Sequence, residues 1–251
     1  MSRFTQLFRT TVGQKAVAAI TGAMLFGFVI LHMAGNLKTF TGTTASGVPH
    51  VDIYAAFLRT MGEPLIPYGS ALWTMRIILL IAIVLHIGTV VHLAAHNREA
   101  RNVHYARHVH TSTTWPARSM LASGVLLLGF VVIHILQFTT GTIDVTPIIQ
   151  GEVYTNLSKA FGEWFFALFY VGAMALLGMH LYHGAWSLFQ TLGFDNPDRN
   201  GRLRALAAIS AGVIFLGFCS VPVLFFIGAM PAPPDAETVN AAAVAGSNLT
   251  P

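Results

Sequence analysis

The chain has 251 residues, of which 54% are hydrophobic and only 10% are charged, and its mean hydropathy is +0.64. Because a soluble domain usually carries about 25% charged residues, this composition predicts an integral membrane protein and leaves little of the chain for a soluble domain. The net charge of +4 comes from basic residues between apolar segments, so it indicates membrane topology rather than binding to nucleic acid. The single cysteine, Cys219, excludes a disulfide framework or a thiolate metal cluster within the chain.

Five apolar segments follow one another, and each is long enough to cross the hydrocarbon core of a bilayer as a helix. They cover residues 16–37, 71–95, 119–139, 164–190 and 204–230. The first begins near Ala16 and is too long for the apolar part of a signal peptide, so we expect no cleavable signal. The sequence therefore predicts an all-α integral membrane protein with five transmembrane helices in one domain over residues 1–230.

The segments between the predicted helices are more polar, and we expect them to be loops. Residues 38–70 are rich in Gly, Thr and Pro, and residues 96–118 are basic and rich in histidine. The segment from residue 231 to residue 251 has low complexity, which predicts a disordered tail.

The basic residues are distributed unevenly between the two sides of the membrane. Ten of the 14 Lys and Arg residues, but only three of the 10 acidic residues, fall on the side of the N-terminus. The ten are Arg3, Arg9, Lys15, Arg98, Arg101, Arg107, Arg118, Arg199, Arg202 and Arg204. Because Lys and Arg are enriched in cytoplasmic loops, we expect a cytoplasmic N-terminus and an external C-terminus.

Histidine recurs inside the first four apolar segments, where an ionisable side chain indicates a function. His32 and His134 lie seventeen and sixteen residues beyond the basic residue that precedes each outward-running helix. At about 1.5 Å per residue, both reach nearly the same outer depth. His86 and His180 lie on the two inward-running helices, nearer the cytoplasmic side. The four histidines therefore sort into an outer pair and an inner pair.

Two imidazoles at one depth on different helices can bind one iron from the opposite faces of a haem. The spacing therefore predicts two b haems, with His32 and His134 as the axial ligands of the outer iron and His86 and His180 as those of the inner iron. The first four helices would form this haem-binding bundle, and glycines within them would leave room for the macrocycle. These glycines are Gly22, Gly27, Gly88, Gly124, Gly129, Gly178 and Gly184.

Other interpretations of these histidines stay open. A single histidine near a helix end is more often hydrogen-bonded than a ligand. Zinc or copper needs its ligands clustered at one depth, which the two-level arrangement does not favour. His183 shares a helix face with His180 and competes with it as the inner ligand, although we favour His180. His92 is turned by about 600° from His86, so we expect it, like His183, to belong to the haem environment.

The four histidines stand in the strings LHMAGNL, LHIGTVVHLAAHNREAR, VIHILQF and GMHLYHGAWSLFQTLGFDNP. These strings resemble the cytochrome b membrane anchor of succinate:quinone oxidoreductases. More narrowly, they are similar to the single-chain, five-helix, dihaem cytochrome b558 type of bacterial succinate dehydrogenases and fumarate reductases. The resemblance covers residues 14–230, and NREAR and HGAWSL are its most specific parts.

The resemblance implies the same ligand pairs and assigns the fourth ligand to His180, because Gly184 follows it by four residues. It further implies a flavoprotein subunit that oxidises succinate and an iron–sulfur subunit that passes the electrons on. This chain would carry them through two b haems to a membrane quinone, with menaquinone expected, and would hold no succinate site. The expected location is the bacterial plasma membrane, with the basic cytoplasmic loops as the docking face for the iron–sulfur subunit.

Proton transfer is where the chain departs from some relatives. Fumarate-reducing relatives can carry a glutamate two residues before the fourth ligand, and this chain has Gly178 there. No Asp or Glu lies within the five segments, so we expect no proton path built on a buried carboxylate. Quinone reduction still needs a proton donor, and Glu63, which precedes the second helix, is the outer-side candidate for the quinone site.

Two other functions would also place histidines in membrane helices. The cytochrome b of a hydrogenase or formate dehydrogenase has similar chemistry, but the NREAR and FDNP contexts favour the first interpretation. A transporter with histidine proton relays would predict broken helices, intramembrane acids or a repeat. We expect none of these features from the sequence.

Overall fold

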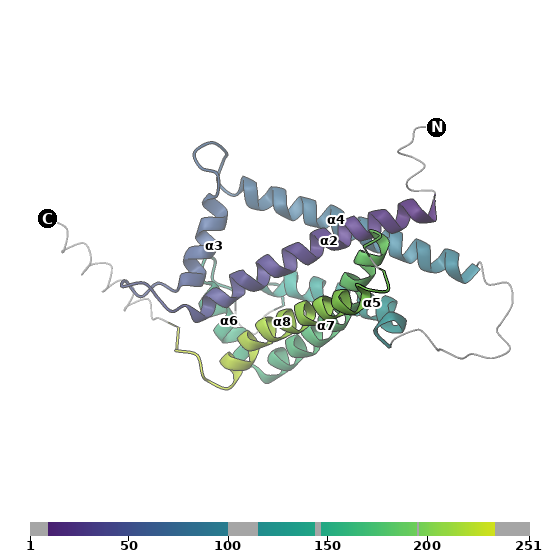
Figure 1. The fold of residues 1–251 in the computed structure, drawn as a ribbon. Coiled ribbons are helices and arrows are strands. Elements are labelled where there is room, and N and C mark those ends of the chain that lie inside the picture. Colours follow the sequence, from purple (N-terminus) through teal and green to yellow (C-terminus); the bar gives the residue numbers. More distant parts are fainter. Residues whose placement is uncertain (1–9, 100–114, 144–146, 195, 234–251) are drawn as a thin grey trace. The chain divides into compact units, whose positions relative to one another are not determined.

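The computed structural model describes residues 10–99, 115–143, 147–194 and 196–233, and the side chains of residues 115–118 are not described. The predicted tail from residue 234 and the basic loop of residues 100–114 lie outside these ranges. The described residues form seven α-helices and one 3₁₀ turn (Figure 1). These are α2 (Thr11–Leu37), η1 (Lys38–Phe40), α3 (His50–Thr60), α4 (Ser70–Glu99), α5 (Trp115–Phe138), α6 (Val153–Gly162), α7 (Trp164–Thr191) and α8 (Asn200–Phe226).

Five of these helices are long and apolar enough to cross a membrane. The candidate spans are Thr11–Phe40, Ser70–Glu99, Ser119–Phe138, Trp164–Thr191 and Asn200–Phe226. At about 1.5 Å per residue, even the shortest, with 20 residues, matches a hydrocarbon core of about 30 Å. The prediction of an all-α, multi-pass membrane protein with five spans is therefore confirmed.

The last helix ends earlier than the apolar pattern predicts, because a glycine terminates it. Gly228 has a φ of 69°, a left-handed conformation that favours glycine. Its N–H donates to the carbonyl of Phe225 at 3.1 Å, and the N–H of Ala229 donates to the carbonyl of Leu224 at 3.0 Å. This pair of bonds is the Schellman motif, so α8 stops at Phe226 although apolar residues continue beyond it.

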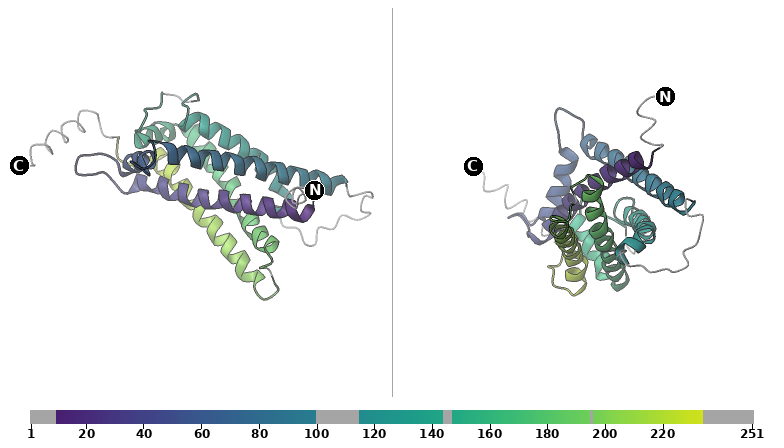
Figure 2. Two further views of the ribbon diagram at one scale, coloured as in Figure 1. Left: turned by 90° about the horizontal axis from the view of Figure 1, so that it is seen from above. Right: turned by 45° about the vertical axis from the view of Figure 1, so that its right-hand side comes forward.

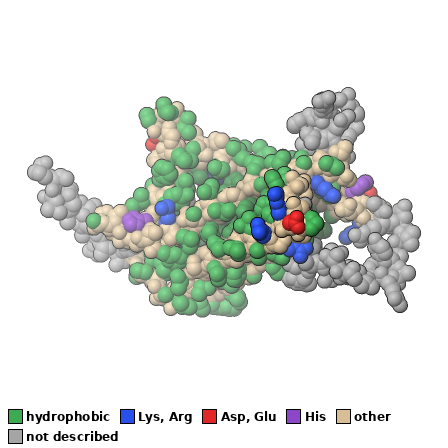
Figure 3. Space-filling model, viewed as in Figure 1, with side chains coloured by type: hydrophobic (Ala, Val, Ile, Leu, Met, Phe, Trp, Pro, Cys, Tyr) green, Lys and Arg blue, Asp and Glu red, His purple; other side chains and the backbone are tan. Residues whose placement is uncertain are grey.

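The outward faces of the long helices are apolar, as expected for side chains that meet lipid. Leu31, Leu80 and Leu216 are 62%, 62% and 67% exposed. Figure 3 shows hydrophobic side chains over most of the visible face, with charged side chains only in places. Such extensive exposed apolar surface is rare on soluble monomers, so it supports the assignment of these helices to a membrane.

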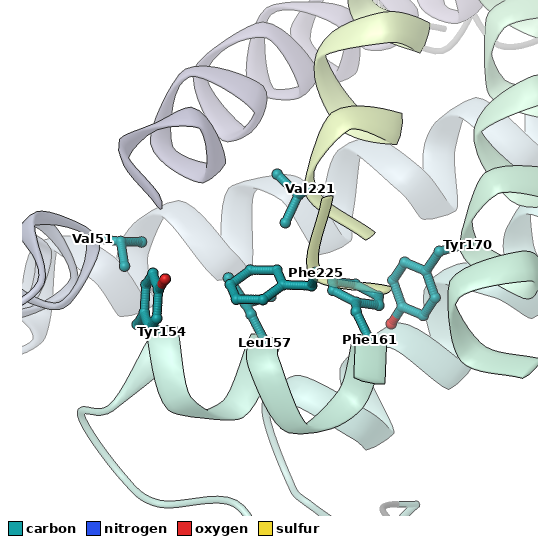
Figure 4. Close-up of a cluster of buried hydrophobic side chains, with 7 residues drawn as sticks. All are labelled: Val51, Tyr154, Leu157, Phe161, Tyr170, Val221 and Phe225. Atoms are coloured by element: carbon teal, nitrogen blue, oxygen red, sulfur yellow. The ribbon is translucent and has the colours of Figure 1, made fainter. Parts of the chain in front are cut away.

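Two short helices, α3 and α6, lie in segments where the sequence predicts loops. The apolar side chains of α6 recur at Tyr154, Leu157 and Phe161, the spacing of one helix face. Figure 4 shows all three pointing from α6 toward Val221 and Phe225 of α8. Because this face is buried, the connecting segment is a packed part of the fold.

The carboxylate of Asp52 on α3 caps the N-terminus of α6. It accepts the backbone N–H of Tyr154 at 2.9 Å, whereas Glu152, at the N-cap position, makes no capping bond with its own side chain. Burial raises the pKa of Asp52 above its ordinary value of 3.8, an effect that the N–H groups of Tyr154 and Val153 oppose and the charge of Glu152 reinforces. A helix N-terminus attracts a carboxylate, so Asp52 ties α3 to α6.

The chain folds into two compact units, and each is assembled from three separate stretches. The first unit comprises Met1–Val29, Arg76–Leu128 and Leu176–Val213, and the second comprises Ile30–Met75, Gly129–Ala175 and Ile214–Pro251. In the first unit α2 lies beside α4, as Figure 2 shows and as hydrogen bonds between them require. In the second unit the buried apolar cluster around α6 and α8 also includes Val51 of α3 and Tyr170 of α7 (Figure 4).

Replacing Asp52 tests the cap on α6. Asp52→Ala removes the acceptor and should destabilise the protein by about 1 kcal/mol. Asp52→Asn keeps an oxygen acceptor and removes a partly desolvated charge, so at pH 7 it should be at least as stable as the wild type. Thermal unfolding in detergent measures both.

The difference in stability between the wild type and Asp52→Asn should also depend on pH. The folded state holds the Asp52 proton more tightly than the unfolded chain, so the wild type gains stability as pH falls through the raised pKa toward 3.8. Any advantage of Asp52→Asn should therefore disappear over this range. An Asn variant as unstable as the Ala variant at pH 7 would contradict the cap.

Candidate functional site

The four histidines singled out by spacing lie on four different helices, two in each unit. His32 of α2 and His134 of α5 belong to the second unit, and His86 of α4 and His180 of α7 belong to the first. All four side chains are neither fully buried nor fully exposed. Each unit therefore contains the two histidines that the depth argument pairs.

In the second unit the two imidazole rings lie close together. The ring centres of His32 and His134 are 5.8 Å apart, and the rings are inclined by 80°. A metal–imidazole bond is about 2 Å long, so two rings that bind one metal from opposite sides have centres about 6 Å apart. The spacing of these two rings fits one iron between them.

The surroundings of this pair are aromatic. The rings of Phe130 and Phe138 lie 5.8 and 5.6 Å from that of His134. The ring of Phe218 lies 5.8 Å from that of His32. Such side chains exclude water, and a dry environment favours neutral imidazole, the form that binds metal.

The Nδ1 atom of His134 faces a hydrogen-bonded pair of polar side chains. It lies 3.2 Å from the hydroxyl oxygen of Tyr170, which donates its own proton to Gln137 Oε1 at 2.9 Å. Gln137 is fully buried and Tyr170 is 6% exposed. The chain of three side chains thus lies inside the second unit.

In the first unit His86 is held against α2. Its Nδ1 lies 3.1 Å from the carbonyl oxygen of Ala18 and 3.3 Å from Thr21 Oγ1. A Cβ at Gly22 would come within 3.2 Å of the imidazole Cε1 of His86. Glycine at this position therefore permits the close approach of the ring to the α2 backbone.

His180 is held in the same way against α5. Its Nδ1 lies 3.1 Å from Ser123 Oγ, and a Cβ at Gly124 would lie 3.6 Å from its Cε1. The hydroxyl of Ser123 also donates to the carbonyl of Met120 at 3.0 Å. His86 and His180 both belong to the first unit.

These parallel contacts reveal a repeat that the sequence analysis did not expect. Residues 21–32, TGAMLFGFVILH, align without gaps with residues 123–134, SGVLLLGFVVIH, and six of the 12 positions are identical. Each copy begins with a hydroxyl residue and a glycine that meet an inner histidine, and each ends with an outer histidine. The expectation that the chain contains no repeat is therefore wrong for these two segments.

The remaining candidates lie in different surroundings. His183 packs its ring 5.9 Å from that of Trp186. Trp186 donates to Asn200 Oδ1 at 3.1 Å and lies under the guanidinium of Arg204 at 4.0 Å. His92 is exposed on α4, and Glu63 is exposed in the turn between α3 and α4. The haem-environment and quinone roles given to these residues stay predictions.

Two buried polar atoms fit a bound group that carries hydrogen-bonding atoms of its own. Gln137 Nε2 and His183 Nδ1 have no hydrogen-bond partner among the described residues. Gln137 follows His134 by three residues and His183 follows His180 by three, so each lies one turn from a candidate ligand. An unpartnered buried polar atom costs about 1–3 kcal/mol.

Sequence reasoning missed the polar partners of the histidines. These are Thr21, Ser123, Gln137 and Tyr170, and all of them lie within predicted spans. The sequence feature that could have identified them is a polar side chain inside an apolar segment, at the same depth as a candidate ligand on another helix.

Compact metal sites offer a contrast. Among the residues that the structure describes, no group of three or more His, Cys, Asp or Glu side chains could hold a metal ion. A structural zinc site needs four such ligands and a catalytic one needs three. Haem iron can be held by two histidines, because the macrocycle supplies the other four ligands.

No family model, curated protein or solved structure matches the chain. The structure shows an all-helical protein with five candidate membrane-spanning helices, in which His32 and His134 belong to one compact unit and His86 and His180 belong to the other.

Gly22→Ala tests the close approach of His86 to α2. Alanine favours a helix by up to about 1 kcal/mol, but its Cβ must displace the imidazole and weaken its hydrogen bond to Ala18. We expect a net loss of stability in thermal unfolding. Gly212→Ala is the matched control, because a Cβ there meets nothing within 4 Å. Equal gains in both variants would contradict the proposed contact.

Proposed function

We propose that this chain is the dihaem cytochrome b anchor of a succinate:quinone oxidoreductase. It transfers electrons between an iron–sulfur subunit and a membrane quinone. The observation that carries the haem assignment is the repeat in α2 and α5, whose two final histidines, His32 and His134, bring their rings to 5.8 Å. Two copies of one sequence pattern that meet at their histidines are hard to explain as separate structural histidines.

The hydrogen bonds of the histidines support ligation through Nε2. The carbonyl of Ala18 can only accept, so His86 carries its proton on Nδ1. Ser123 donates its own proton to Met120, so its oxygen accepts from His180 Nδ1–H. In both rings Nε2 is left with a free lone pair. A histidine ligand typically donates its other N–H to such an acceptor, which fixes the ring and raises its basicity.

A bound haem b supplies a one-electron couple at its iron. The histidines of this chain hold that group and set its orientation. Phe130 and Phe138 shield His134 from water. The chain needs no succinate site, since the flavin and iron–sulfur groups belong to the partner subunits.

The narrower assignment to succinate oxidation or fumarate reduction rests on the sequence strings around the histidines. The strings NREAR and HGAWSL carry it, together with the five spans. The distribution of Lys and Arg supports a cytoplasmic N-terminus. The resemblance supports a bacterial plasma-membrane location and menaquinone as the electron acceptor or donor.

Haem content tests the proposal directly. The full complex should contain two b haems for each copy of this chain, measured by its reduced α-band and by the pyridine haemochrome. His32→Gly or His134→Gly should remove one haem, and His86→Gly or His180→Gly should remove the other. A colourless wild type overturns the proposal.

Two controls separate loss of a ligand from loss of the fold. Free imidazole can occupy the space left by each His→Gly change and should restore the missing haem. His183→Ala is the matched neighbour variant and should keep both haems. Loss of haem with His183→Ala but not with His180→Gly would move the inner ligand to His183.

The quinone site gives a separate prediction. Glu63→Gln should slow quinone turnover without haem loss, because the amide cannot deliver a proton. The matched control is Glu152→Gln, which changes another exposed acid of the second unit. Unchanged turnover in Glu63→Gln would remove Glu63 from the site.

A further inference from the structure

The side chains of Gln137, Tyr170 and His134 form a continuous chain of hydrogen bonds in an apolar part of the second unit. Tyr170 Oη lies 2.9 Å from Gln137 Oε1 and 3.2 Å from His134 Nδ1. The rings of Phe130, Phe138 and Phe161 lie 5.1, 5.9 and 5.0 Å from that of Tyr170. A polar group is costly in such surroundings unless each of its atoms has a partner, so the arrangement calls for a function.

With the Gln137 amide oriented so that its oxygen faces Tyr170, counting the protons gives the direction of each bond. Tyr170 has one hydroxyl proton, and it goes to Gln137 Oε1. Its oxygen can then only accept from His134, so the His134 proton lies on Nδ1 and its Nε2 carries a free lone pair. This is the tautomer that the Ala18 carbonyl imposes on His86 and that Ser123 imposes on His180.

The outer histidine differs from the inner ones in how this tautomer is secured. His86 uses a backbone carbonyl, and His180 uses a hydroxyl whose proton goes to a backbone carbonyl three residues earlier. For His134 the acceptor is a phenol on another helix, and its orientation depends on a third side chain, Gln137. Without Gln137 the phenol could turn its proton toward Nδ1, which would weaken the hydrogen bond that His134 Nδ1–H donates and with it the preference for the ligating tautomer.

We propose that Tyr170 and Gln137 are positioning residues that hold His134 in the ligating tautomer and tune the iron it binds. The proposal rests on the proposed function. A hydrogen bond from Nδ1–H makes the imidazole a stronger donor to the metal, and loss of such an outer partner typically changes metal affinity or activity by about 10–100-fold. A stronger donor stabilises the oxidised iron, so removing the acceptor raises the potential of the outer haem.

The test is a redox titration of the full complex, followed at the α-band, with Tyr170→Phe. We expect both haems to be retained and the reduction equilibrium of one haem to shift about tenfold toward the reduced form, which is 59 mV for a one-electron couple. Ser123→Ala should instead shift the other haem, because its hydroxyl faces His180. Tyr154→Phe is the matched control, since its hydroxyl donates to the carbonyl of Pro231 and should shift neither haem.

Gln137→Met keeps the core filled and separates this proposal from a simple packing role. It should shift the same haem in the same direction as Tyr170→Phe. The double variant should shift it no further, because both residues act through one hydrogen bond. Additive shifts, or a Tyr170→Phe complex with both potentials unchanged, would overturn the positioning role while the proposed function stands. A wild type without haem would overturn both.

Discussion

The fold depends on one constraint, which is that a polar group inside a lipid-facing helical protein must find its partner within the protein. The Nδ1 atoms of His86, His134 and His180 each meet an acceptor on a neighbouring helix. Because the long helices are apolar on their outer faces, packing alone would allow them to rotate or slide. These hydrogen bonds form only in one relative orientation of the helices, so they define which faces of α2, α4, α5 and α7 meet within each unit.

The same constraint explains which residues recur in the two copies of the repeat in α2 and α5. A small hydroxyl residue followed by glycine provides an acceptor and a close approach, and eleven residues later the histidine lies about 16 Å along the helix axis. One helix therefore contributes to both units, first as a support for another helix's histidine and then with a histidine of its own. The two copies make the four-histidine arrangement from one pattern used twice.

Much of this could be predicted from the sequence. Apolar length fixed the number of spans, and counting residues from the charged ends paired His32 with His134 and His86 with His180, the pairs that each unit contains. Helix ends were less predictable, since Gly228 stops α8 within an apolar segment by its backbone conformation.

Other features could not be read from single segments. Helix α6 is short, and its apolar face is buried only because it packs against Val221 and Phe225, which lie about sixty residues later in the chain. The partners of the histidines are likewise distant, such as Tyr170, 36 residues from His134. Polar residues such as Gln137 look like minor interruptions of a hydrophobic run until the helices are assembled.

The interleaving of the two units along the chain has a consequence for how such a protein can change. Each unit takes three stretches that alternate with those of the other, so a single deletion that spans both histidines of one pair also removes a histidine of the other pair. A variant that lacks one whole pair and keeps the other therefore requires substitutions at two separate positions of the chain.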